Sequence, residues 1–353
     1  MVHISDLIAT DIDSYLAIHE QKELLRFITC GSVDDGKSTL IGRMLYESHM
    51  LFDDHLAALE ADSKKDGTQG GEIDFALLVD GLAAEREQGI TIDVAYRFFS
   101  TDKRKYIVAD TPGHEEYTRN MATGASTADV AIILVDASQG ILTQTRRHSF
   151  IVSMVGVKRI VLAVNKLDLV NYSQEVFEEI VTQYRSFADE ALELEEITAV
   201  PISALKGDNI VGSSENTPWY DGPSIMEYLE SVEVTAAAQS RPFRMPVQWV
   251  NRPDREFRGF AGLIGSGTVS PGDKIRVLPS GTESTIERIV TWEGDLELAG
   301  AGRSVTLTLS DEIDISRGDI ITTAENPCSS ADQFQTRILW MDESAMMPGR
   351  EYL

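Results

Sequence analysis

The sequence predicts an α/β domain with a mostly parallel sheet and helices on both faces, followed by an all-β barrel and the start of a second β domain. Two observations predict this order. Up to residue 234, buried-strand patterns alternate with helical patterns, which is typical of a parallel sheet covered on both sides. From residue 243 to 324, short alternating runs are separated by glycine and proline turns, and no helical period is present.

The α/β domain is expected to span residues 25–234, after a lead-in at 1–24. Its strand-like runs are short, apolar and bounded by turn residues. They lie at 24–30, 92–99, 105–109, 130–135, 160–164 and 197–201. The helical stretches lie at 38–49, 53–65, 76–88, 115–125, 144–155 and 174–194.

The second domain is expected at residues 241–328, after a short linker rich in alanine, glutamine and serine. Runs such as PVQWV, DKIRVLP and SVTLTL have the length and spacing of barrel strands. Another strand-like stretch, FQTRILWM, begins at residue 334. We expect residues 332–353 to be the start of a truncated third domain, also a β-barrel.

Composition is that of an ordinary globular protein, with 42% hydrophobic and 25% charged residues in 353. No apolar run reaches the roughly 18–20 residues that span a bilayer, so no membrane association is expected. Aspartates interrupt the first 16 residues, which argues against a signal peptide. The two cysteines lie far apart and predict neither a disulfide framework nor a zinc site. We therefore expect a cytoplasmic location.

The net charge of −26 bears on the choice of partners. Such a surface repels phosphate backbones and supplies few cations to replace their counterions. Nucleic acid is therefore not expected as the main partner. The alternative is that the acidity serves solubility alone.

The first motif, GSVDDGKS at residues 31–38, follows a strand and opens a helix. This is the P-loop pattern, in which glycines let backbone N–H groups surround phosphates at the N-terminus of a helix. Lys37 is expected to reach the β- and γ-phosphates, and the Ser38 hydroxyl to ligate Mg²⁺. The phosphate-binding candidates here are Gly31, Ser32, Val33, Asp34, Asp35, Gly36, Lys37, Ser38 and Thr39.

The second motif, DTPG, ends the strand-like run KYIVA. Its aspartate is expected to hold Mg²⁺ through a water molecule, and its glycine N–H to sense the γ-phosphate. Its candidates are Asp110, Thr111, Pro112 and Gly113.

The third and fourth motifs, NKLD and SAL, predict which base is bound. Guanine presents two adjacent donors to which the Asp168 carboxylate can bind, whereas adenine has none there, so ATP should be rejected. Lys166 is expected along the base plane, and a backbone N–H of the SAL loop at guanine O6. The guanine-binding candidates are Asn165, Lys166, Asp168, Ser203, Ala204 and Leu205.

The order of the motifs decides the interpretation. All four occur in sequence, each at the carboxyl end of a strand, where an open α/β sheet binds ligands. The first domain is therefore predicted to be an α/β P-loop GTPase domain that binds GTP, GDP and Mg²⁺.

Two residues between and after these motifs are candidates for the hydrolytic step. Thr91, in REQGITI, would complete the Mg²⁺ shell and contact the γ-phosphate, so that hydrolysis would release its segment. His114 directly follows DTPG and could orient or polarise the attacking water. The alternative roles are an ordinary threonine opening a strand and a structural histidine.

These strings together resemble the translation-factor GTPases, in the branch of elongation factor 1A. The strings VDDGKS, VNRPDREFRGFAG and DEIDISRGD resemble more narrowly the GTPase subunits of bacterial sulfate adenylyltransferases. The elongation factors usually carry histidine where this chain has Asp35. The resemblance covers about residues 20–345.

The resemblance implies that GTP hydrolysis is coupled to the formation of adenosine 5′-phosphosulfate and diphosphate from ATP and sulfate. It implies a heterodimer with a catalytic subunit that performs the adenylyl transfer. It also implies an apolar gate of Val33 and Ile90 beside His114, and a monovalent cation near Asp34. The alternatives are an elongation-factor-like carrier of aminoacyl-tRNA and a non-catalytic, GTP-dependent scaffold.

Overall fold

The structure is a computed structural model, and it describes residues 22–48, 63, 73–79, 91, 93–234, 236–254, 257–292, 294–342 and 344–352. The chain divides into two compact units. The first runs up to Val232 and includes the segment from Leu339, and the second spans Glu233–Ile338. Among the residues described, no helix has the length and apolar character that crossing a membrane requires.

The first unit is built on a six-stranded sheet in the order β2-β3-β1-β4-β5-β6. The edge strand β2 is antiparallel to β3, and the other neighbours are parallel. The strands are β1 (Glu23–Cys30), β2 (Ala95–Ser100), β3 (Arg104–Asp110), β4 (Val130–Asp136), β5 (Arg159–Asn165) and β6 (Glu196–Pro201). This confirms the predicted mostly parallel sheet.

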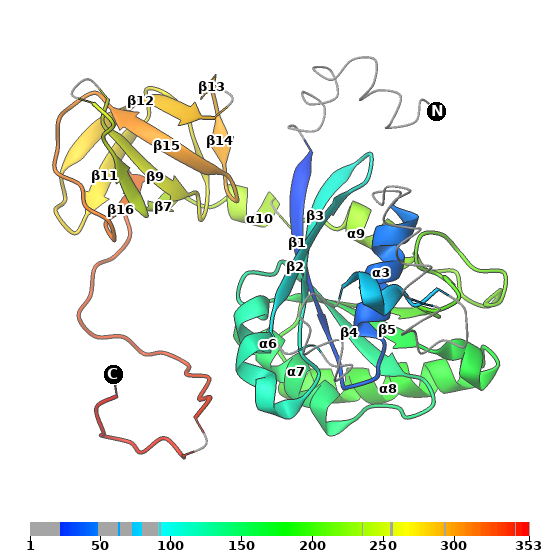
Figure 1. Cartoon of the computed structure of the whole chain (residues 1–353). Helices are drawn as coiled ribbons and strands as arrows, with labels where there is room; N and C mark the ends of the chain where they lie inside the picture. Colours follow the sequence, from blue (N-terminus) through cyan, green and yellow to red (C-terminus); the bar gives the residue numbers. More distant parts are fainter. Residues whose placement is uncertain are drawn as a thin grey trace, which may run out of the picture. The chain divides into compact units, whose positions relative to one another are not determined.

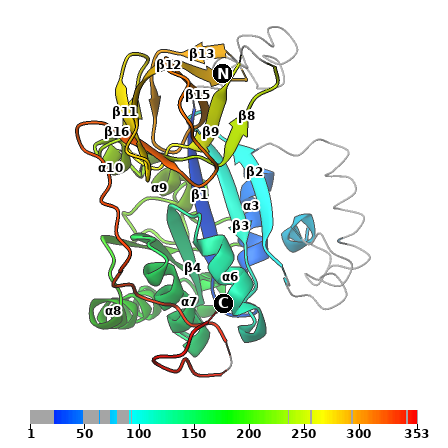
Figure 2. The ribbon, with the colours of Figure 1, turned by 90° about the vertical axis from the view of Figure 1, so that its left-hand side faces the viewer.

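Helices cover both faces of this sheet (Figures 1 and 2). On one face lie α6 (Thr118–Ala125), α7 (Thr143–Met154) and α8 (Gln174–Ala191). On the other lie α3 (Lys37–Glu47) and α9 (Ile225–Ser231). Short 3₁₀ turns are η1 (Phe75–Leu78), η2 (Glu115–Tyr117) and η3 (Leu167–Val170).

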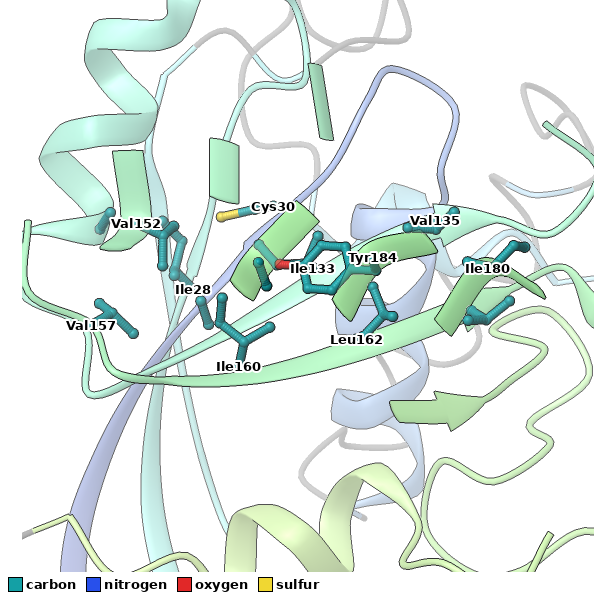
Figure 3. Close-up of a cluster of buried hydrophobic side chains, with 14 of the residues drawn as sticks. Ile28, Cys30, Ile133, Val135, Val152, Val157, Ile160, Leu162, Ile180 and Tyr184 are labelled. Atoms are coloured by element: carbon teal, nitrogen blue, oxygen red, sulfur yellow. The ribbon is translucent and has the colours of Figure 1, made fainter. Parts of the chain in front are cut away.

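A hydrophobic core lies between the sheet and the helices α6, α7 and α8. It forms because strands that are buried on both sides carry nearly continuous apolar residues. β4, for example, is buried along its whole length. Figure 3 shows side chains of three neighbouring strands, among them Ile28, Ile133 and Leu162, meeting Val152 of α7 and Tyr184 of α8. All five side chains are fully buried.

Parallel pairing brings the carboxyl ends of the strands to one edge of the sheet. Thr29 pairs with Asp110 in the β1–β3 register, and Asp136 pairs with Asn165 in the β4–β5 register. Residues far apart in the sequence therefore gather at this edge, where α/β sheets bind ligands.

The second unit is a β-structure that curls on itself. Its main sheet runs β7-β16-β11-β12-β15-β9-β8, and Arg244 of β7 also bonds to the turn after β9, with Arg244 N donating to Ser266 O at 2.9 Å. Its elements are α10 (Ala236–Gln239), β7 (Arg244–Pro246), β8 (Trp249–Asn251), β9 (Gly259–Leu263), β10 (Thr268–Val269), β11 (Lys274–Leu278), β12 (Glu283–Thr291), β13 (Gly294–Leu296), β14 (Ala299–Gly300), β15 (Ser304–Leu309) and β16 (Ile320–Thr323). The β-rich second part of the chain is thus confirmed.

Two sequence-based expectations about elements differ from the structure. The stretch 334–341, predicted as a strand, pairs with no strand among the described residues, and a strand without a partner leaves its backbone groups unpaired. Where a helix was expected from residue 76, the structure has the short η1, and residues 80–90 lie outside the described part. The predicted helix 53–65 also lies outside it, apart from residue 63.

Candidate nucleotide-binding site

The glycine-rich loop 31–36 joins β1 to α3 at the carboxyl edge of the sheet. Gly36 has a φ of 90°, in the left-handed region that favours glycine. A Cβ at this position would lie 2.4 Å from Nδ2 of Asn165. Glycine is therefore needed here both for the backbone turn and for the close approach of Asn165.

Asn165, at the end of β5, joins two loops. Its Nδ2 donates to the main-chain oxygen of Asp35 at 2.7 Å, and its Oδ1 accepts from the N–H of Ala204 at 2.9 Å. Asn165 is 2% exposed, so both halves of the amide need such partners. The residue predicted to bind guanine thus fixes the P-loop against the SAL loop.

Lys166 and Asp136 form an ion pair at the same edge, with Nζ 2.9 Å from Oδ2. The Asp136 carboxylate also accepts from the N–H and the hydroxyl of Ser138, at 2.8 and 2.6 Å. Burial alone would raise the pKa of Asp136, but the hydrogen bonds from Ser138 and Lys166 outweigh it and the pKa is lowered. Asp136 was not predicted from the sequence, although an aspartate that ends an apolar strand was a usable signal.

The end of the site that would meet the base contains the other predicted residues. Asp168 lies half-buried in η3, the short turn that follows Lys166. In the SAL loop, Ser203 and Ala204 are buried and Leu205 is half-buried, and the Ser203 hydroxyl accepts from the N–H of Lys206 at 3.2 Å. The structure therefore brings both predicted guanine motifs to one side of the P-loop.

Lys37 is a buried cation held by neutral groups. Its Nζ donates to Ser32 O at 2.7 Å and to Gly31 O at 3.5 Å. Burial lowers the pKa of Lys37, while Asp110 and Asp35 oppose that shift. A Cβ on Gly113 would lie 2.6 Å from Nζ, so the DTPG loop passes directly over this amine. A phosphate in contact with Nζ would offset the cost of burying the charge.

The predicted metal ligands converge on Asp110. The hydroxyls of Ser38 and Thr91 donate to Oδ2, at 3.1 and 3.5 Å. The hydroxyl of Thr29, which was not predicted as a ligand, donates to Oδ1 at 3.5 Å. Hydroxyl and carboxylate oxygens are the hard ligands that Mg²⁺ prefers, with phosphates and water completing its shell. The residues present therefore fit Mg²⁺, and they come from β1, α3, the segment before β2 and β3.

Two further loop residues have defined partners. The Asp35 carboxylate accepts from Ser32 N at 2.5 Å, and burial raises its pKa to about 6 against the opposing effect of Lys37. The Thr111 hydroxyl donates to Thr29 O at 2.6 Å. Of the predicted gate, Val33 is half-buried, and Ile90 lies outside the described residues.

His114 follows Gly113 and caps η2, with 43% of its side chain exposed. Its Nδ1 accepts from the N–H of Glu116 at 3.3 Å. Since Nδ1 accepts, the neutral ring carries its proton on Nε2. His114 is thus placed to donate a hydrogen bond from Nε2, which suits orienting a water molecule better than removing its proton.

His148 of α7 contacts the first residue of the P-loop. It was not predicted from the sequence. Its Nδ1 accepts from the N–H of Gly31 at 3.2 Å, and its Nε2 lies 2.9 Å from Nε2 of Gln144. Burial, together with Lys37 and Arg147, lowers the pKa of His148 to about 3. This ring is therefore a neutral acceptor that holds the first residue of the loop.

Two comparisons with known proteins identify the family. Residues 22–241 match the family described as the elongation factor Tu GTP binding domain. Over 353 residues the chain is 61% identical to sulfate adenylyltransferase subunit 1 of Saccharophagus degradans, covering all of this chain and 75% of that protein. The chain belongs to the sulfate adenylyltransferase subunit 1 family. The family protein of Colwellia psychrerythraea is also 61% identical, over 352 residues and 75% of its length.

For this member of the sulfate adenylyltransferase subunit 1 family, solved structures support the fold alone. The GTPase-like domain of S. cerevisiae Ski7, bound to GDP and inorganic phosphate, has a TM-score of 0.53 at 19% identity, over 89% of this chain and 77% of that one. The family assignment does not favour the alternative of a carrier of aminoacyl-tRNA. A GTP-binding domain implies GTP and GDP as ligands and Mg²⁺ as the usual metal, and the family's name implies a partner subunit.

Proposed function

We propose that this chain binds and hydrolyses GTP as the GTPase subunit of a sulfate adenylyltransferase, and that hydrolysis drives the transfer of an adenylyl group from ATP to sulfate. The observation that carries the proposal is the convergence of Ser38 and Thr91 on Asp110, beside the buried amine of Lys37, in a chain of this family. This arrangement of a buried amine beside hydroxyl and carboxylate oxygens suits a nucleoside triphosphate with its Mg²⁺.

The residues divide the work of binding. Asp168 accepts the two guanine donors and Lys166, fixed by Asp136, lies along the base. Lys37 and the N–H groups of the P-loop bind the phosphates. Mg²⁺, when bound, neutralises charge on the β- and γ-phosphates. Asn165 holds the base-binding and phosphate-binding loops at a fixed distance from each other.

The residues that follow the DTPG motif act in hydrolysis. The Gly113 N–H senses the γ-phosphate, and His114 donates from Nε2 to the attacking water and orients it. Thr91 contacts the γ-phosphate from the other side. When hydrolysis removes that phosphate, the contact is lost and the segment before β2 is released. In this proposal Val33 contributes to the apolar gate beside His114.

The partner in this proposal is a separate catalytic subunit, in a heterodimer. Residues 25–234 are the GTPase domain and 241–328 an elongation-factor-like second domain. A reaction that consumes ATP and GTP places the complex in the cytoplasm.

Asp34, whose φ is 67° and whose side chain is exposed, would bind a monovalent cation at the phosphates.

The test is GTP turnover by the full-length protein mixed with its catalytic subunit. We expect turnover to rise when ATP and sulfate are both present, and to fall to the basal rate when either is omitted. A GTP turnover rate that does not depend on ATP and sulfate would contradict the coupling. Replacing K⁺ by a large organic cation tests the monovalent site, because turnover should fall if Asp34 holds that ion.

A further inference from the structure

The guanidinium of Arg43 links the helix after the P-loop to the loop that would meet guanine O6. Arg43 lies on α3, and its Nε donates to Ala204 O at 3.3 Å. Its Nη2 donates to Leu205 O, and its Nη1 lies 3.3 Å from Glu47 Oε1. All three nitrogens therefore have partners, and two of those partners are carbonyl groups of the SAL loop.

The position of this guanidinium is fixed on its other sides as well. Its Cζ lies 4.3 Å from the centre of the Phe75 ring, a cation–π distance. Gly207, with a φ of 89°, passes so close that a Cβ there would lie 3.0 Å from Glu47 Oε1 and 3.6 Å from Cζ of Arg43. Only 14% of the Arg43 side chain is exposed. The loop is thus packed directly against this arginine.

Holding carbonyls also sets the direction of N–H groups, since a trans peptide is planar and its C=O and N–H point opposite ways. Arg43 binds the carbonyl of Ala204, so the N–H of Leu205 in the same peptide points away from α3. The next peptide is held at both ends, because Leu205 O accepts from Arg43 and Lys206 N donates to the Ser203 hydroxyl. The preceding N–H, of Ala204, is held by Asn165.

We propose that Arg43 is a positioning residue for base recognition, which orients the peptide between Ala204 and Leu205 so that the Leu205 N–H donates to guanine O6. The inference rests on the proposed function and assigns that role to a residue outside the four motifs. A lysine cannot replace Arg43, because one ammonium lacks the planar fork that spans both carbonyls. α3 begins at the phosphate-binding Lys37, so the same helix sets both ends of the site.

The experiment compares GTP with two analogues that each change one position of the base. We would measure dissociation constants of GTP, 6-thio-GTP and ITP for the full-length protein and for R43A and R43K. 6-Thio-GTP replaces O6 by a poor acceptor, whereas ITP lacks only the 2-amino group that Asp168 recognises. The matched control is R146A, which removes another helical arginine stacked on an aromatic ring, at 4.9 Å from the centre of Phe187.

We expect R43A to weaken GTP binding about tenfold and 6-thio-GTP binding much less, so the preference for GTP over 6-thio-GTP collapses. The preference for GTP over ITP should stay unchanged, since both keep O6. R43K should behave like R43A, and R146A like the wild type. R43K retains an aliphatic chain and a positive charge, so it provides the comparison if R43A does not fold.

Equal losses for all three nucleotides, with both preferences unchanged, would overturn the proposal and leave Arg43 a general brace of the fold. A wild-type protein that fails to prefer GTP over ITP would instead contradict the proposed function itself, and this role with it. The two failures are therefore distinguished by the wild-type measurements alone.

Discussion

Asn165 donates through its side-chain amide to the main-chain oxygen of Asp35 at 2.7 Å, which joins the end of β5 to the middle of the P-loop. Base recognition and phosphate binding thus share one buried side chain. A change at Asn165 should therefore affect more than contacts to guanine.

Substituting Asn165 by Ala removes two buried hydrogen bonds and leaves the Ala204 N–H without its partner. We expect GTP and GDP binding to weaken by about 2–4 kcal/mol, with GDP dissociating correspondingly faster. The measurement is the dissociation rate of a fluorescent GDP analogue. Asn251→Ala, in β8, serves as the control and should leave that rate unchanged. Unchanged GDP release in Asn165→Ala would show that the two loops are held by other contacts.

Substituting Asp168 by Asn should exchange the base specificity. Xanthine has a carbonyl group where guanine has its 2-amino group, and an asparagine amide can donate to it. We expect GTP affinity to fall at least about 100-fold and XTP affinity to rise. Competition binding with both nucleotides measures the exchange. Retained GTP preference in this variant would remove Asp168 from the base-binding role.

Substituting His114 by Ala should slow hydrolysis by about 100-fold or more with little loss of GTP affinity. His114→Gln should recover part of the rate, because its amide also donates a hydrogen bond to water. Single-turnover hydrolysis at saturating GTP separates the chemical step from binding. If His114 removed a proton instead, Gln would be as inactive as Ala, and unchanged turnover in His114→Ala would end its assignment.

His148 predicts a specific dependence of stability on pH. Its pKa is lowered to about 3 in the folded protein, mainly by burial, against an ordinary value of 6.5. Between these values the unfolded chain binds a proton and the folded protein does not, so stability falls as pH falls, by about 1.4 kcal/mol per pH unit. Asp35, with a pKa raised to about 6, acts in the opposite direction from pH 6 downward.

The contribution of His148 is isolated by comparing wild type with His148→Gln, whose side-chain oxygen can still accept from Gly31. We expect the difference in the free energy of unfolding between the two proteins to shrink as pH falls below 6.5, since only the wild type loses this contribution. Urea unfolding from pH 7.5 to 4.5 measures it. Parallel curves would show that His148 does not stay neutral in the folded protein.

Local patterns were enough to predict the sheet and the four motifs. A glycine-rich turn between an apolar strand and a helix, and polar residues that end apolar strands, depend only on neighbours in the sequence. Asp110 and Asn165 were found in this way, and the structure brings both to the same edge.

Residues that contact the site from outside the four motifs were not predicted. His148 contacts Gly31 over 117 positions, and Arg43 contacts Ala204 over 161. No local pattern marks either one, because an arginine or histidine on a helix is most often a surface or packing residue. The stretch 334–341 shows the opposite error, because its local pattern predicted a strand that the structure does not contain. A local pattern does not show whether a neighbouring strand is present to pair with it.

The most direct test of the central claim is the amount of adenosine 5′-phosphosulfate formed at the end of the reaction. The complete enzyme, this chain with its catalytic subunit, would receive ATP and sulfate together with GTP or with a non-hydrolysable GTP analogue. Coupling predicts that GTP drives the product beyond the level reached with the analogue, until the GTP is exhausted. Equal final amounts with both nucleotides would contradict it, because GTP would then act as a bound regulator and not as the energy source.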